Sequence, residues 1–350
     1  MTPLNAVADL LAEVGPIDEA ARDAALERFA ALATPPGALG RIEPLGAQLA
    51  AIAGSCPPPA LDDPGLVIAA ADHGVHAQGV SPWPQAITAA MVQTFCAGRA
   101  TANAFAGIVD ARVTVLDVGV ATPLADHPRL RRSNVRPGTR DLSVEPAMSD
   151  DDCARAILAG AGAAEELLSA GSNLLATGDM GIANTTAAAA LIAVFTHEEA
   201  LDVTGRGTGI DDATLARKVG AVEAAVARHR DDEPLGALAG VGGLEHAALV
   251  GVILAAAAGR VPVVLDGVNA CAAALAAVAI APDCHGYLLA GHRSTEPGAT
   301  VALEHLRLEP LIDLQLRLGE GTGALLAIPL LQAAAAALRE IATLDEVLGS

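Results

Sequence analysis

The feature that most constrains the fold is a recurring order of apolar run, glycine-rich polar loop and alanine-rich segment. An uninterrupted apolar run is typical of a parallel strand buried on both faces, and alanine favours helix. The order recurs at least five times, which predicts an α/β fold: a Rossmann-like, mostly parallel sheet with helices on both faces. The apolar runs are residues 65–71, 112–118, 173–177, 262–265 and 287–290.

Two helical segments precede the first apolar run. One begins at Asp18, a residue suited to capping a helix, and the other spans residues 38–53. Together with the alanine-rich C-terminal segment they predict a small helical domain of residues 1–60, completed by about 325–350. Residues 61–324 form the expected large α/β catalytic domain, with one helix over 85–106 and irregular chain over 126–147.

Charge and cysteine usage limit the partners. Lys+Arg 21 against Asp+Glu 41 gives a net charge of −20, which repels nucleic acid and anionic lipid and excludes both as partners. The five scattered cysteines lack metal-ligand spacing and are typical of reduced thiols. No signal peptide is recognisable and apolar runs such as 247–258 are too short to span a bilayer, so we expect a cytoplasmic protein.

A single carboxylate, Glu320, lies among three alternating glycines at positions 319, 321 and 323. The apolar-alternating residues 311–318 before it predict a strand end, and the alanine-rich chain after it predicts a helix start. Glycine lets the backbone approach a ligand closely. Two interpretations remain open at this point: Glu320 caps its own loop, or it is a catalytic base in a glycine-lined pocket.

Two further loops resemble anion sites. Residues 178–186 combine Asp179 and Gly181 with Asn184 and Thr185 at a helix start, where free N–H groups attract phosphate. Residues 205–212, with Gly207 and Gly209, open the helix that carries Lys218, so they could form a second wall with Lys218 as the point charge. The alternative in both places is an ordinary capped turn.

Other patterns are weaker or missing. Asp72-His73-Gly74 follows a strand, but no second ligand has metal spacing, so we expect no metal and an Asp72 that orders a loop. The roles of His73, His76 and His292 remain open. No P-loop, serine-hydrolase elbow or zinc-protease motif occurs, and the 319–323 glycines are not a full dinucleotide fingerprint.

Taken as a set, the motifs resemble the nicotinate-nucleotide–dimethylbenzimidazole phosphoribosyltransferase family of cobalamin synthesis. The resemblance implies transfer of phosphoribose from nicotinate mononucleotide to a benzimidazole base by a homodimer that needs no metal or other cofactor. The matching segments are residues 35–41, 71–75, 117–119, 178–186, 265–267, 291–298 and 317–323.

The resemblance also implies roles for individual residues. Glu320 matches the catalytic base, and Asp179 matches a second acid that is commonly glutamate, one methylene longer. The implied phosphate and nucleotide site contains Gly181, Asn184, Thr185, Gly207, Gly209, Lys218 and Ser294. The implied base pocket contains Trp83, Met91 and Leu318; some members have Ser and Gln at the first two positions, so the preferred base is open.

Two other functions remain as alternatives. One is another α/β enzyme that handles a mononucleotide, such as a dehydrogenase or a phosphatase. The other is a catalytically inactive binding paralogue, whose signature would be loss of the carboxylate that is present here as Glu320.

Overall fold

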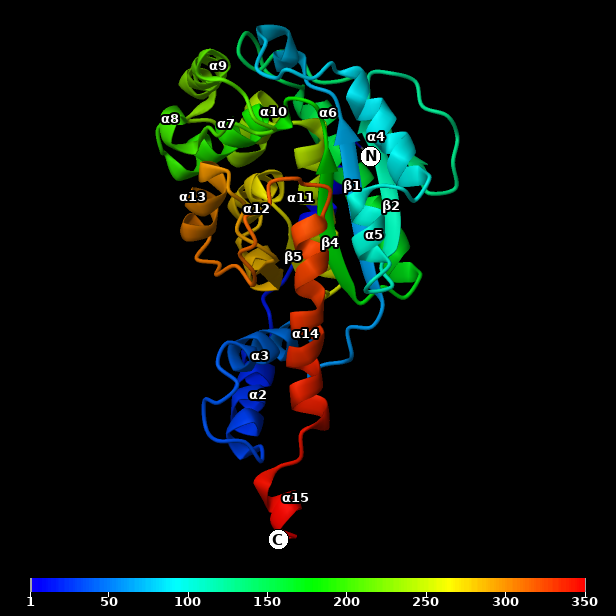
Figure 1. Ribbon diagram of the computed structural model, residues 1–350, viewed down its shortest axis with the longest axis vertical. Coiled ribbons are helices and arrows are strands. Elements are labelled where there is room, and N and C mark those ends of the chain that lie inside the picture. The colour runs from blue at the N-terminus through cyan, green and yellow to red at the C-terminus, as the bar shows by residue number, and fades with distance from the viewer. Residues whose placement is uncertain (1, 350) are drawn as a thin grey trace.

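The computed structural model describes residues 2–349 and is built around one six-stranded parallel sheet of order β3-β2-β1-β4-β5-β6 (Figure 1). This is the strand order of the doubly wound dinucleotide-binding folds, and the predicted Rossmann-like α/β class is confirmed. The strands are β1 (Pro64–Ala71), β2 (Arg112–Gly119), β3 (Leu130–Arg132), β4 (Leu174–Met180), β5 (Val263–Leu265) and β6 (Leu288–Ala290).

Helices cover both faces of the sheet and extend below it (Figure 1). In chain order the helices are α1 (Pro3–Glu13), α2 (Glu19–Ala31), α3 (Ile42–Ala53), α4 (Ala86–Cys96), α5 (Thr101–Ala106), α6 (Asp150–Ser169), α7 (Asn184–Thr196), α8 (Ala200–Val203), α9 (Asp212–His229), α10 (Pro234–Val241), α11 (Leu244–Ala258), α12 (Val268–Ile280), α13 (Pro297–His305), α14 (Thr322–Glu340) and α15 (Leu344–Leu348). Two 3-10 turns, Gly74–Gln78 and Pro282–Tyr287, complete the regular structure.

Alternate residues of the central strand point into two separate apolar clusters, as the two-residue period of a strand requires. Val67 and Ala69 of β1 pack with α6, α7, α11 and α12, whereas Leu66 and Ile68 pack with α4, α5 and α14. Because β1 is buried on both faces, an uninterrupted apolar run is the only sequence that suits it.

Helices α6 and α11 cross closely, and the crossing depends on two glycines. A Cβ atom on Gly160 would lie 1.8 Å from the carbonyl oxygen of Ala248. A Cβ atom on Gly251 would lie 1.8 Å from the carbonyl oxygen of Ile157. The backbones of α6 and α11 therefore approach each other more closely than a side chain at either glycine would permit.

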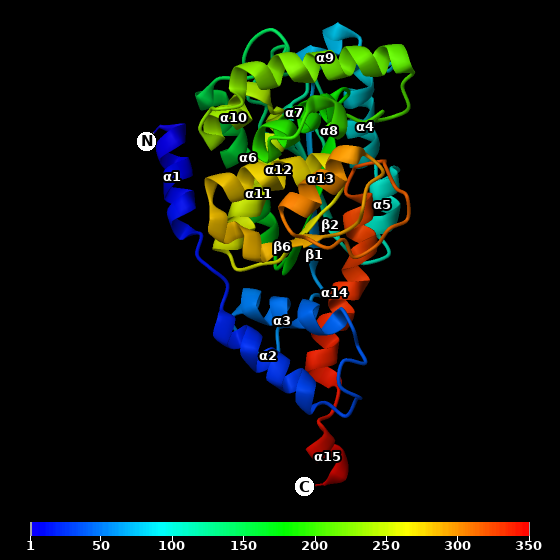
Figure 2. The same ribbon diagram turned by 90° about the vertical axis from the view of Figure 1, so that its left-hand side faces the viewer.

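A helical appendage of α2, α3 and the second half of α14 lies below the sheet (Figure 2). Phe29, Ala47 and Leu338, one from each helix, meet in its core. Asp18 caps α2 by accepting a hydrogen bond from the Ala21 N–H. Helix α1 packs on α6 and α11 instead, so the proposed division of the chain near residue 60 stays a prediction.

The strand predicted over residues 311–318 is wrong. This segment makes one isolated bridge, between Ile312 and His292, and otherwise runs as irregular chain along the loop after β6. Pro310 at its start has no N–H to donate, and Gln315 adopts a φ of 58°, which a strand does not accommodate. Glu320 therefore follows irregular chain rather than a strand.

Two other expectations need correction. The helix predicted over 85–106 is broken into α4 and α5 near Gly98, whose φ of 74° ends the first helix. Residues 126–147 contain the short edge strand β3, which an alternating pattern could not reveal in three residues.

Helix α14 is long and apolar enough to cross a membrane by length and composition, and no other helix of residues 2–349 is. Its apolar 18-residue window is 61% buried inside the protein, as in the core helix of a folded domain. All five cysteines are free, and Cys96, Cys153, Cys271 and Cys284 are buried.

Gly160→Ala should lower the free energy of unfolding by about 1–3 kcal/mol, because the added methyl group forces α6 away from α11. Gly220→Ala on α9 is the matched control, since a Cβ atom there meets open space. Alanine should stabilise that helix by up to about 1 kcal/mol. Urea unfolding of both variants checks the prediction; equal stability would contradict the close crossing.

Candidate active site

A cleft of about 110 Å³ opens at the carboxyl ends of the strands. It lies beside the point where the strand order reverses, between β1 and β4, which is where open α/β sheets bind ligands. The loops after β1, β4, β5 and β6 contribute to it, together with residues 206–210 and 317–319 and one side chain of α9.

One wall of the cleft carries a buried ammonium group. Lys218, the only lysine in the sequence, is 2% exposed and donates to Oγ1 of Thr185 at 2.8 Å and to the carbonyl of Gly205 at 2.9 Å. Burial lowers the pKa of Lys218 to about 8, against the opposing effect of Glu296. An ammonium has three N–H donors, so one remains for an anion in the cleft.

The floor of the cleft carries a buried carboxylate. Oδ2 of Asp179 accepts hydrogen bonds from the amides of Asn184 at 2.8 Å and Asn269 at 2.7 Å, whereas Oδ1 is buried without a partner. Burial and, next, the charge of Asp266 raise the pKa of Asp179 to about 7. The free oxygen can accept from a ligand hydroxyl or face a developing positive charge.

The Gly-Glu-Gly loop has a left-handed backbone at three successive residues, with φ of 83° at Gly319, 66° at Glu320 and 88° at Gly321. Such a conformation is unusual for a residue with a side chain and typical of functional loops. The side chain of Glu320 is 6% exposed, and its Oε2 accepts from the N–H of Ala102 at 3.4 Å. Burial raises its pKa to about 7, so Glu320 can hold or release a proton near neutral pH.

Asp266, which follows β5, holds this loop in place. Its carboxylate accepts hydrogen bonds from the backbone N–H groups of Gly321, Gly323 and Ala324, at 3.1, 2.7 and 3.1 Å. The free N–H groups at the start of α14 are thereby paired by a side chain from another strand. Asp179 lies against the same loop, because a Cβ atom on Gly319 would be 3.5 Å from its Oδ2.

The structure brings most of the predicted site residues together. Asp179, Gly181, Asn184, Thr185, Gly207, Lys218, Ser294 and Leu318 all line the cleft. Gly209 lines an adjoining hollow that shares Gly207 and Arg317. The close packing also explains Gly181, because a Cβ atom there would lie 2.5 Å from the carbonyl oxygen of Ala71.

The three predicted base-binding residues are more dispersed. Leu318 is 54% exposed on the lining. Trp83 is outside the lining, but its indole N–H donates to Oγ1 of Thr208, a lining residue, at 3.1 Å. Met91 of α4 packs against the apolar cluster on that face of the sheet and does not line the cleft. Glu320 does not line it either, because it lies behind Gly319.

Residues without an assigned role from the sequence complete the site. Asp266, Asn269 and Glu296 face the loops just described, and Glu296 accepts from the N–H of Gly207 at 2.8 Å. The sequence offers one signal for Asn269, because no other residue of α12 has an amide or charged side chain. Lys218 had a clearer signal as the only lysine in the chain.

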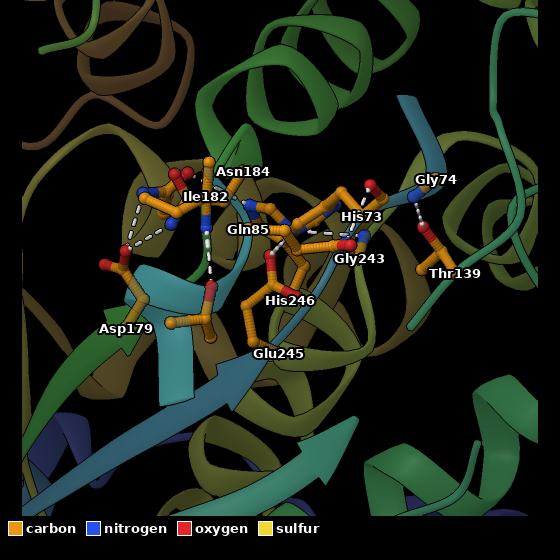
Figure 3. Close-up of polar contacts among 12 residues, drawn as sticks. His73, Gly74, Gln85, Thr139, Asp179, Ile182, Asn184, Gly243, Glu245 and His246 are labelled. Atoms are coloured by element: carbon orange, nitrogen blue, oxygen red, sulfur yellow. Dashed lines mark hydrogen bonds and ion pairs between the residues drawn. The ribbon is translucent and has the colours of Figure 1, made fainter. Parts of the chain in front are cut away.

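The structure also locates the three histidines whose roles the sequence left open. His292 lines the cleft, 3.6 Å from Asp266, and His76 contacts the carbonyl of Trp83 at 2.8 Å. His73 lies deeper, against Glu245 (Figure 3). Asp72 orders a different loop from the one expected, since its Oδ2 accepts from the N–H of Ala121, after β2, at 2.8 Å.

The cleft therefore combines a cation and helix N–H groups for an anion with the carboxylate of Asp179, and the second carboxyl with a raised pKa, Glu320, lies directly behind its Gly319 edge. Within residues 2–349, no group of three or more His, Cys, Asp and Glu side chains is arranged to hold a metal ion. Such a site can hold a phosphorylated substrate, stabilise positive charge and accept a proton.

Comparisons with known proteins agree on one family. The phosphoribosyltransferase family model matches residues 14–347. The nicotinate-nucleotide–dimethylbenzimidazole phosphoribosyltransferase of Salinispora tropica is 54% identical over 350 residues, covering 95% of this chain and 96% of its own, and that of Chloroflexus aurantiacus is 49% identical, covering 98% of each. A crystal structure of the Thermus thermophilus enzyme matches with a TM-score of 0.91 at 46% identity, covering 95% of this chain and 99% of its own.

The Glu320→Gln variant should be more stable than the wild type, by a margin that grows as the pH rises. A carboxyl whose pKa is raised by folding favours the folded state below its unfolded pKa, and this contribution is lost as the pH rises through about 7. The difference in thermal midpoint between variant and wild type should therefore grow between about pH 5 and pH 8. Glu223→Gln, at an exposed position of α9, is the control; a constant difference for Glu320→Gln would contradict the raised pKa.

Proposed function

The chain belongs to the nicotinate-nucleotide–dimethylbenzimidazole phosphoribosyltransferase family, and we propose that Glu320 is the general base of its reaction. The protein transfers phosphoribose from nicotinate mononucleotide to dimethylbenzimidazole, a step of cobalamin biosynthesis. The observation that carries the role of Glu320 is a buried carboxyl with a pKa raised to about 7, on a loop that crosses the cleft.

The reaction exchanges one carbon–nitrogen bond for another. An unprotonated ring nitrogen of the base attacks C1′ of the ribose, and the bond between C1′ and nicotinate breaks with its electron pair going to nicotinate. The N–H proton of the attacking base passes to the Glu320 carboxylate as the new bond forms. Attack opposite the leaving group inverts C1′ and gives an α-nucleotide, α-ribazole 5′-phosphate.

Asp179 is suited to the charge that develops at C1′. As nicotinate departs, the ribose acquires oxocarbenium character, and a preorganised carboxylate stabilises that charge. The unpartnered Oδ1 of Asp179 supports this role. We assign the phosphate to the other wall, at the start of α7 and beside Lys218, where Thr185 and Gly207 lie.

We place the benzimidazole near Glu320, between Leu318 and the segment that carries Trp83 and Met91. Tryptophan and methionine make an apolar slot, which favours a methylated benzimidazole over adenine. Direct competition between the two bases, followed by mass spectrometry of the products, measures this preference; a preference for adenine would contradict it.

We also propose a cytoplasmic homodimer. Helix α15 projects from the tip of the appendage (Figure 2) and exposes Leu344, Val347 and Leu348 at 52%, 62% and 69%. A second chain could cover these side chains. Light scattering that gives the mass of one chain would contradict the dimer.

Glu320→Gln should lower kcat by about 10²–10⁴-fold, the range typical of general-base catalysis, because an amide cannot take the proton. The amide oxygen can still accept the hydrogen bond from Ala102, so the fold should persist. Initial rates with nicotinate mononucleotide and dimethylbenzimidazole provide the measurement. Glu223→Gln is the control, and activity near wild type in Glu320→Gln would direct attention to Asp179 instead.

Lys218→Ala should raise the KM for nicotinate mononucleotide by about ten- to a hundredfold, the worth of a hydrogen bond to a charged group. The KM for the base should change much less, because the lysine faces the opposite wall. Lys218→Met, which keeps the length without the charge, separates charge from packing. Equal effects on both substrates would argue against the assignment.

A further inference from the structure

A buried group of titratable side chains lies outside the lining of the cleft. His73 follows β1, whereas Glu245 and His246 begin α11, and all three side chains are 0% exposed (Figure 3). Charged side chains are almost never fully buried unless they are paired. The reaction steps described above use none of them.

Both imidazole rings contact the same carboxylate oxygen. Oε1 of Glu245 lies 2.9 Å from Nε2 of His73 and 2.8 Å from Nδ1 of His246, as ion-pair contacts rather than well-aligned hydrogen bonds. Burial alone would lower the pKa of His246, but the Glu245 carboxylate raises it overall. The carboxylate fits only because position 243 is glycine, since a Cβ atom there would lie 2.3 Å from Oε1.

This group reaches the cleft through one amide. Nε2 of His246 lies 3.3 Å from Oδ1 of Asn269, and Nδ2 of Asn269 donates to Oδ2 of Asp179 at 2.7 Å. The contacts form a continuous path from the buried Glu245 to the carboxylate on the cleft floor.

The carboxylate of Asp179, at one end of this path, fixes the direction of the hydrogen bonds made by Asn269 and His246. An ionised Asp179 only accepts, so Asn269 must turn its NH₂ group toward Asp179 and its oxygen toward His246. Nε2 of His246 must then carry a proton, whether the ring is neutral or charged. If His246 could not donate, the oxygen of Asn269 would be left without its partner at position 246, and the hydrogen bond to Asp179 alone would hold the amide in place.

We propose that His246 is a positioning residue, which acts through Asn269 to hold the carboxyl group of Asp179 with its free oxygen toward the reacting carbon. The inference rests on the proposed role of Asp179 in stabilising positive charge. Glu245 and His73 in turn hold the imidazole in place. The path thus ties the first turns of α11 and α12 to the end of β4.

The effect on pH dependence follows from the groups around Asp179. Burial, Asp266 after β5 and Glu245 favour its protonated form, whereas His246 and the amide of Asn269 favour the carboxylate. Lys218 of α9 and Glu296 lie across the cleft. Loss of the donor from His246 should therefore make Asp179 easier to protonate and move the acid limb of the rate profile to higher pH.

The test compares His246→Leu, which removes the donor, with His246→Gln, whose amide reaches about as far as Nε2 and can still donate. We expect kcat of His246→Leu to fall by about ten- to a hundredfold, with a smaller change in KM for nicotinate mononucleotide. His246→Gln should recover most of this loss. His229→Gln, at a buried histidine paired with Asp232 outside the cleft, should leave kcat and the pH profile unchanged.

Three further variants keep the test decisive. If His246→Leu does not fold, Glu245→Gln/His246→Leu and Glu245→Gln/His246→Gln make the same comparison without an unpaired carboxylate. Asp179→Asn tests the role on which the inference rests: wild-type activity there would overturn both. If Asp179→Asn is impaired but the leucine and glutamine variants share one kcat and one pH profile, the inference about His246 alone is overturned.

Discussion

The site depends on the carboxylate of Asp266 more than on any other single group. It accepts three backbone N–H groups at the start of α14 and so fixes the loop that carries Glu320 over the sheet. The loop needs this support because three successive residues are left-handed, and such a backbone persists only where its surroundings hold it. One short strand, β5, thereby sets the position of a side chain that is about fifty residues later in the chain.

The proximity of Asp266 to Asp179 and Glu320 also explains the electrostatics of the site. Asp179 and Glu320 both have pKa values raised by burial, and the charge of Asp266 adds to each. Keeping acids buried opposes folding at neutral pH, but it places their proton exchange where the reaction needs it. In a chain of net charge −20, Lys218 supplies local positive charge for an anionic substrate, together with Arg206 and Arg317 of the lining.

The fold could be predicted further than the site. Continuous apolar runs followed by alanine-rich segments marked five of the six strands, because burial on both faces imposes that pattern. The run over 311–318 misled because its alternating apolar residues share no buried face: Leu314 and Leu318 are 59% and 54% exposed. Strand β3 is too short for any period. The candidate residues 179–185, 218 and 294 meet in one cleft because strand ends of a parallel sheet share an edge.

The contacts among Glu245, His246 and Asn269 could not be read from the sequence, because their pairing depends on how α11 and α12 pack, not on spacing. Glu245 and His246 are the only polar side chains in α11, and Asn269 is the one amide in α12. A polar group in a buried helix must find a partner, so each such residue predicts that a partner exists without naming it. Gly243, directly before α11, makes room for this group, because a Cβ atom there would lie 2.3 Å from Oε1 of Glu245. The absence of a side chain at one position therefore allows the contacts that lead from Glu245 to the carboxylate in the cleft.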